Sequence, residues 1–192
     1  MITSPYCTIG PYFPYSFVDG LEDLTKFGEQ SARGQRIEIR GRVLQEGNLP
    51  TRNSILEIWQ PDANGVFRHS LDPRCREADP GFRGWGRSRT DAQGNYWFRT
   101  VMPGAYAAED GRPRCPHINL MILAIGLTRR MVTTIFFADN PEQVSDPVLD
   151  CVPMEARNRL FATKQSGQAD DCLSYRFDVI LRGEHETPFF LD

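Results

Sequence analysis

The sequence lacks the features that would point to a membrane or to nucleic acid. It has no apolar run near the roughly 20 residues that a membrane-spanning helix needs, and its first residues lack the charged-then-apolar order of a signal peptide. It also lacks an excess of one charge, because 22 basic and 25 acidic residues leave a formal net charge of −3. Such a chain has no net positive potential that would attract nucleic acid or an anionic membrane surface. We therefore expect a cytoplasmic protein with neither of these partners.

Patterned cysteines and phosphate-binding loops are absent as well. The five cysteines are odd in number and scattered, with no C-x-x-C spacing, which excludes a disulfide framework and a zinc site of the usual kind. There is no Gly-rich phosphate loop and no internal repeat, so nucleotide chemistry has no support. We expect free thiols at Cys7, Cys75, Cys115, Cys151 and Cys172.

What the chain does have is material for one core. Its 192 residues are 40% hydrophobic and include 12 Phe, 6 Tyr and 3 Trp, enough to fill a single domain. Segment 36–44 alternates polar and apolar residues, which predicts a strand with Ile37, Ile39 and Gly41 on one face. Segment 174–183 alternates in the same way. The prevailing period of two indicates a β protein.

Further strands follow from turn signals and apolar runs. A strand at 54–60 is followed by a turn and a resumed strand at 66–69, and turn 91–94 joins a predicted strand pair at 84–90 and 95–100. The apolar runs 118–125 and 131–138 are typical of central strands buried on both sides. The predicted fold class is mainly β: a single antiparallel β-sandwich domain with an N-terminal arm and short surface helices.

Two segments have helical spacing of their apolar residues, 19–27 and 152–165, and both are predicted to be short surface helices. We place an N-terminal arm with the first of them at 1–35 and the sandwich at 36–192. The arm holds three prolines and several polar turns, which is typical of an arm rather than of a domain.

Several motifs together resemble the intradiol ring-cleaving dioxygenases over nearly the whole chain. They are EIWQ-x-D-x-x-G from residue 57, MPGAY from 102, RPRCPHIN from 112, TTIFFADN from 133 and YRFDVILRGEHETPFF from 175. The resemblance implies a β-sandwich with a mononuclear ferric ion held by two tyrosinates and two histidines, where O2 is inserted beside the hydroxyls of a catechol. Phenolate and imidazole donors suit a trivalent ion.

Carried over residue by residue, the resemblance gives an incomplete ligand set. The second tyrosine falls on Tyr106, an activating arginine on Arg114 and the first histidine on His117, whereas Arg74 stands at the first tyrosine and Asn119 at the second histidine. An amide is a poor ligand for Fe(III), and an arginine brings positive charge toward it. The resemblance therefore implies a vestigial site and no metal or cofactor bound by this chain.

Such a degenerate site is similar to that of the alpha chain in two-chain members of the family. This implies a homologous beta partner that carries Fe(III), a large αβ hetero-oligomer, and protocatechuate (3,4-dihydroxybenzoate) and O2 as substrates. No catalytic residue is then expected in this chain. The resemblance assigns pocket-lining roles at the interface to Thr8, Gly10, Pro11, Tyr12 and Thr134.

Thr134 departs from the family pattern, which has an arginine there. A threonine can donate a hydrogen bond but cannot form the bidentate ion pair that arginine offers a carboxylate. Arg129 and Arg130, a few residues upstream, are candidates to compensate.

Structural interpretations stay open beside the functional ones. Tyr106 has the pattern of a corner residue whose hydroxyl binds the backbone, and His117 that of a hydrogen-bonded core histidine. Arg74 and Arg114 can pair with loop acids; the candidates are Glu77, Asp79, Glu109 and Asp110. Two other functions also remain: a self-sufficient intradiol dioxygenase acting on another catechol, and a non-catalytic β-sandwich binding protein.

Overall fold

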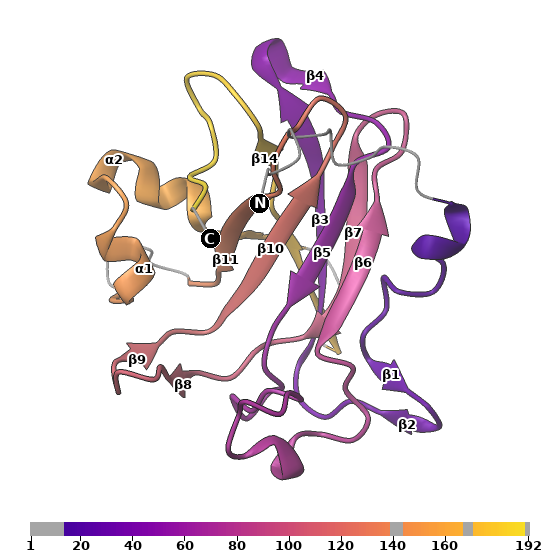
Figure 1. Cartoon of the computed structure of the whole chain (residues 1–192), viewed down its shortest axis with the longest axis vertical. Helices are drawn as coiled ribbons and strands as arrows, with labels where there is room; N and C mark the ends of the chain where they lie inside the picture. The colour runs from indigo at the N-terminus through magenta and orange to yellow at the C-terminus, as the bar shows by residue number, and fades with distance from the viewer. Residues whose placement is uncertain (1–13, 139–143, 167–170, 191–192) are drawn as a thin grey trace, which may run out of the picture.

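The structure is a computed structural model that describes residues 14–138, 144–166 and 171–190. Two packed β-sheets form its body, and α1 (Pro147–Asp150) and α2 (Met154–Arg157) lie on the side of β11 (Figure 1). The mainly-β sandwich predicted from the sequence is confirmed. No helix in these residues is long and apolar enough to span a membrane. Cys7 and the predicted pocket residues Thr8, Gly10, Pro11 and Tyr12 lie outside the described residues.

The first sheet has four strands in the order β11-β10-β5-β6, and every neighbouring pair is antiparallel. The strands are β5 (Ile55–Trp59), β6 (Trp85–Arg89), β10 (His117–Leu123) and β11 (Met131–Phe136). Alternate residues of β10, among them Ile118 and Leu120, are fully buried in the core between the sheets. Strand β11 is an edge strand, so its predicted place in the centre of a sheet is wrong, although its predicted existence is confirmed.

The second sheet is built around the long strand β3 (Arg36–Gln45). Its other strands are β4 (Leu49–Pro50), β7 (Asn95–Val101), β12 (Thr163–Lys164), β13 (Cys172–Arg176) and β14 (Val179–Ile180). Ile37 and Ile39 point into the core as predicted, and Glu38 on the other face is also buried, beside Arg40 and Arg99. Strands β13 and β14 run parallel to β3, so the sandwich is not purely antiparallel.

Other predicted details are corrected by the structure. The strands predicted as a pair at 84–90 and 95–100 exist as β6 and β7, but β6 pairs with β5 and β7 with β3, in different sheets. The resumed strand at 66–69 is irregular. The predicted helix at 19–27 is a loop that ends in the small strand β1 (Lys26–Phe27), which pairs with β2 (Gln30–Ser31).

The loop that replaces the predicted helix packs on the sandwich. Leu24 is completely buried in the main core, and its N–H donates to the carbonyl of Arg99. The predicted helix at 152–165 shrinks to the four residues of α2, a 3₁₀ turn at Asn158–Leu160 and the strand β12. Further 3₁₀ turns are Tyr15–Phe17, Glu46–Asn48 and Cys75–Glu77. The four described cysteines, Cys75, Cys115, Cys151 and Cys172, are free thiols, as predicted.

Candidate functional site

Tyr106, Arg114 and His117 meet where a small hairpin leads into the four-stranded sheet. The hairpin consists of β8 (Tyr106–Ala107) and β9 (Pro113–Arg114), whose register sets Tyr106 opposite Arg114, and β10 starts at His117. The imidazole Nε2 of His117 lies 3.1 Å from Arg114 Nη2 and 3.3 Å from the Tyr106 hydroxyl. The structure thus brings together the three residues that the motif comparison predicted to share a site.

The protons in this cluster can be assigned from its partners. His117 Nδ1 lies 2.6 Å from the carbonyl oxygen of Cys115, and a carbonyl can only accept, so Nδ1–H is the donor. Nε2 is then the acceptor for the guanidinium of Arg114. Burial, and then the positive charge of Arg114, lowers the pKa of His117 to about 4, while burial raises the pKa of Tyr106. Both rings are therefore neutral near pH 7.

Asp146 anchors the cluster from the segment before α1. Both of its carboxylate oxygens lie 3.0 Å from Arg114 Nε, and they also accept the N–H of Cys115 and of Val148, each at 2.9 Å. The side chain is wholly buried and caps the N-terminus of α1. Sequence reasoning missed this residue and listed other acids as partners of Arg114. The signal available was an Asp-Pro pair of the kind that starts helices.

Arg74 and Tyr106 both line a cavity of about 690 Å³. Arg74 Nη2 donates to the carbonyl of Gly65 at 2.6 Å, and Arg74 Nε is 3.7 Å from Asp72. The prediction that Arg74 pairs with a loop acid is therefore correct in kind, but the acid is Asp72 and none of the four candidates. Aromatic rings form part of the cavity wall, namely those of Trp59, Phe67, His69 and Tyr106.

Asn119 and Thr134 lie on the same outward face of the sheet as His117. Their strands pair Asn119 with Thr134, and the Thr134 hydroxyl donates to the Asn119 side-chain oxygen at 3.4 Å. Thr134 is only 3% exposed, so in this chain its hydroxyl serves the neighbouring amide.

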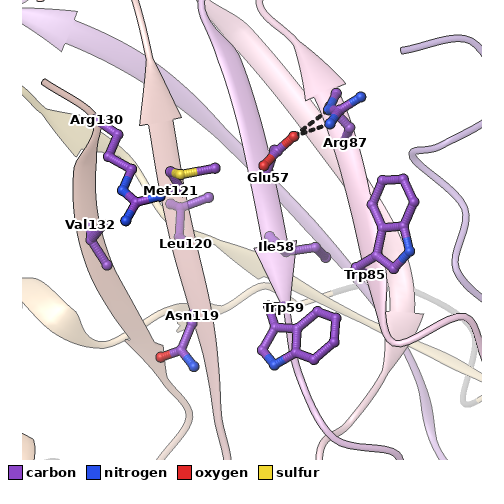
Figure 2. A pocket seen from close by; sticks show the side chains of 10 residues that line it. All are labelled: Glu57, Ile58, Trp59, Trp85, Arg87, Asn119, Leu120, Met121, Arg130 and Val132. Carbon is purple, nitrogen blue, oxygen red and sulfur yellow. Dashed lines mark hydrogen bonds and ion pairs between the residues drawn. The ribbon is translucent and has the colours of Figure 1, made fainter. Parts of the chain in front are cut away.

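A groove of about 700 Å³ begins at Asn119 and runs along this face (Figure 2). The two indole rings of Trp59 and Trp85 lie on one side, and Arg130 lies at the far end, near Met121. The groove combines apolar side chains with the guanidinium of Arg130 and the ion pair of Arg87 with Glu57.

The motif EIWQ-x-D-x-x-G has a structural explanation. Asp62 accepts the N–H groups of Asn64 and Val66 on one oxygen and that of Asp79 on the other, each at 2.9–3.0 Å, so it folds the loop after β5. Gly65 adopts a positive φ of 74°, and a Cβ there would lie 2.1 Å from the carbonyl oxygen of Ala105. Gly104 lies on the other side of this close backbone contact, and a Cβ added there would lie 2.4 Å from the Gly65 nitrogen. These contacts position Tyr106 and the carbonyl that holds Arg74.

The residues at this site do not fit a ferric ion. Only Tyr106 and His117 offer the expected donor types, and the acceptor nitrogen of His117 faces the guanidinium of Arg114. The other two expected positions hold the cation of Arg74 and the amide of Asn119, neither of which suits Fe(III). Within the described ranges, no three His, Cys, Asp or Glu side chains are grouped closely enough to hold a metal.

Comparisons with known proteins agree on one family. The family described as "Dioxygenase" matches residues 9–183. The chain is 38% identical over 175 residues to the protocatechuate 3,4-dioxygenase beta chain of Burkholderia cepacia, covering 86% of this chain and 73% of that one. It is 34% identical over 195 residues to the alpha chain of the same organism's enzyme, covering 97% and 96%.

The fold also matches a solved structure. Catechol 1,2-dioxygenase from Acinetobacter sp. ADP1 superposes with a TM-score of 0.64 at 19% identity, over 88% of this chain and 60% of that one. At this level of identity the match supports the sandwich fold alone.

Proposed function

Because this chain belongs to the intradiol ring-cleavage dioxygenase family, we propose that it is the alpha, non-iron-binding subunit of a heteromeric protocatechuate 3,4-dioxygenase. In this proposal a homologous beta chain holds Fe(III). There 3,4-dihydroxybenzoate and O2 become 3-carboxy-cis,cis-muconate, and the alpha chain completes the pocket. The αβ pair is repeated in a large cytoplasmic oligomer.

The observation that carries the proposal is the state of the ligand positions. Identity does not separate the two kinds of chain, since it is 38% to a beta chain and 34% to an alpha chain. Coverage favours alpha, because this chain spans 96% of the alpha relative and 73% of the beta relative. Arg74 and Asn119 support the alpha assignment, because a chain with these residues and an Arg114–His117 hydrogen bond lacks the donors that iron needs.

The role of the alpha chain would lie at its interface with the partner. We place Thr134 there because it lies on the outward face of the sheet that also carries the vestigial site. Arg130 lines the groove on that face at the end away from Asn119 and Thr134, so it brings a cation to this face of the sheet without replacing an arginine at position 134. The remaining residues proposed for this role are in the N-terminal arm: Thr8, Gly10, Pro11 and Tyr12.

The test is co-expression with a beta-type chain that has both tyrosines and both histidines. We expect a stable complex that consumes O2 when protocatechuate is added, with one iron per αβ pair. The alpha chain purified alone should show neither O2 uptake nor the visible band of a ferric tyrosinate. A ferric tyrosinate band in the isolated chain would contradict the proposal.

The variant Tyr106→Phe separates the proposal from a self-sufficient dioxygenase. In an αβ complex the iron content should be unchanged, because the iron lies in the partner. In a homo-oligomeric iron enzyme the same variant would abolish activity, since Tyr106 would be a ligand. A β-sandwich binding protein without dioxygen chemistry predicts no protocatechuate-dependent O2 uptake in any combination.

A further inference from the structure

The outer face of the six-stranded sheet carries arginines on neighbouring strands. In the register of the sheet, Arg40 on β3 lies between Trp97 on β7 and Arg176 on β13. Arg42 follows two residues later, and alternate residues of a strand share a face. The strand pattern therefore gathers three guanidinium groups and one indole ring on one surface.

A cavity of about 640 Å³ lies over these side chains. Four arginines contribute to its wall, Arg40, Arg42, Arg89 and Arg176, and only one acid does, Asp91. The chain as a whole has more acidic than basic residues, 25 against 22. The local excess of positive charge is therefore a property of this face, and it favours an anion.

The acids near the cavity form ion pairs with these arginines but leave some of their N–H donors available. Glu38 bonds Arg40 through Nε at 2.5 Å, and Asp178 bonds the Nε and Nη2 of Arg176 at 3.1 and 2.9 Å. A guanidinium has five N–H donors, so these bonds leave donors for a ligand. The carboxylate of Asp91 accepts the N–H groups of Gln93 and Asn95 at 2.8 Å, and its pKa is lowered chiefly by its bonds to Asn95 and in part by the charge of Arg42. Asp91 therefore offsets part of the charge of Arg42, whose Nε donates to the carbonyl of Gln93 at 3.2 Å while its other N–H groups stay available to a ligand.

We propose that this cavity is a binding site for a small planar organic anion with two or more carboxylate groups. Arg40 and Arg42 are two residues apart on one strand, a separation of roughly 7 Å between their Cα atoms, so two carboxylates of one ligand can each pair with a separate guanidinium. The ring of Trp97, 38% exposed beside Arg40, offers a flat apolar surface to the planar part of the ligand. Guanidinium groups bind carboxylates through paired, charge-assisted hydrogen bonds.

Apart from Arg89 on β6, the arginines and the tryptophan of this site lie on the six-stranded sheet, whereas the vestigial iron site lies at the four-stranded sheet; the binding proposed here needs neither iron nor a partner chain. Its test is therefore independent of the proposed function. The probe is cis,cis-muconate, a planar dicarboxylate, titrated into the purified full chain while its tryptophan fluorescence is followed. Benzoate, a planar monocarboxylate, is the matched ligand control.

We expect muconate to change the fluorescence saturably and to bind at least about tenfold more tightly than benzoate, because it makes a second charge-assisted pair. The variant Trp97→Phe should remove the signal. Arg40→Gln should weaken muconate binding by about tenfold or more, the loss of one such pair. Arg42→Gln should weaken muconate binding by a similar factor. Because it leaves the Arg40–Glu38 ion pair intact, it shows whether weaker binding in Arg40→Gln comes from the lost ligand contact or from misfolding.

Arg112→Gln is the matched protein control. Arg112 is 62% exposed and bonds an acid two residues away at 2.6 Å, whereas Arg40 is 64% exposed and bonds its acid at 2.5 Å. Muconate binding should be unchanged in Arg112→Gln. Equal weakening in Arg40→Gln and Arg112→Gln, equal affinity for muconate and benzoate, or no binding at about 10 mM would overturn the proposal.

Discussion

The carboxylate of Asp146 holds the guanidinium of Arg114 with both oxygens 3.0 Å from Nε, and this pair fixes the electrostatics of the cluster of Tyr106, Arg114 and His117. The arginine is thereby directed at Nε2 of His117, the atom that a metal would need. Asp146 comes from a segment 32 residues farther along the chain. The pair therefore ties the hairpin β8–β9 to the helical side of the sandwich.

Replacing Asp146 by Asn should lower the free energy of unfolding by about 3 kcal/mol, because it leaves a buried guanidinium without its counterion. Denaturation in urea, followed by fluorescence, measures this change. Asp110→Asn is the control, since Asp110 also pairs with an arginine but at the surface, and it should change stability little. Similar losses in both variants would show that burial of the Asp146 pair has no special weight.

His117 should make stability depend on pH in acid. Its pKa is about 4 in the folded protein and about 6.5 in an unfolded chain. Between these values the unfolded chain binds a proton that the folded protein excludes. The stability that the neutral His117 contributes to the free energy of unfolding is therefore fully present above pH 6.5 and is lost as the pH falls toward 4. The total is on the order of 3 kcal/mol.

The measurement is the free energy of unfolding from pH 4 to 7.5 for the wild type and His117→Gln. The wild-type curve should fall more steeply below pH 6.5 than that of the variant. The exposed His185 supplies a control, since His185→Gln should keep the wild-type slope. Parallel curves for wild type and His117→Gln would contradict the prediction.

The double variant Arg74→Tyr, Asn119→His should gain iron. Position 119 shares the outward face of β10 with His117, and Arg74 lines the same cavity as Tyr106, so the new side chains would join the two donors already present. We expect a visible tyrosinate-to-iron absorption band after addition of iron. The single variant Asn119→His, which keeps the cation of Arg74, should bind iron more weakly. Absence of a band in the double variant would contradict the prediction.

Gly104→Ala should disturb the segment that carries Tyr106. The added methyl group would lie 2.4 Å from the nitrogen of Gly65, against backbone that cannot move aside, so we expect a loss of about 1–3 kcal/mol. Gly111→Ala is the control for backbone strain alone, because Gly111 has a φ of 78° and nothing within 4 Å. It should cost only about 1 kcal/mol. Thermal or urea unfolding distinguishes the two.

The sequence predicted the strands better than their partners. Alternation located β3 and the apolar run located β10, because both patterns follow from burying one face of a strand. The turn at 91–94 was interpreted as a hairpin, but β6 and β7 enter different sheets. A tight turn has the same local sequence in either case, so only packing decides. Leu24, part of a predicted helix, is buried in a loop that bonds to Arg99.

For the site as well, local features were predictable from the sequence and distant contacts were not. Motif spacing brought Tyr106, Arg114 and His117 together correctly, because they lie within 12 residues on one hairpin and its next strand. Asp146 was missed because nothing local to position 114 points to an acid beyond the next two strands. The interface roles of Thr134 and of the arm stay predictions.

The parallel pairing of β13 and β14 with β3 has a consequence for synthesis. Both strands cover the same edge of β3, and the bond from the Arg42 N–H to Asp178 closes a loop of 136 residues. A nascent chain leaving the ribosome therefore carries β3 with one edge unpaired until residues 172–180 emerge. An open edge of this kind can pair with another chain, so the contacts that become possible last during synthesis are also the ones that protect the newly made protein from self-association.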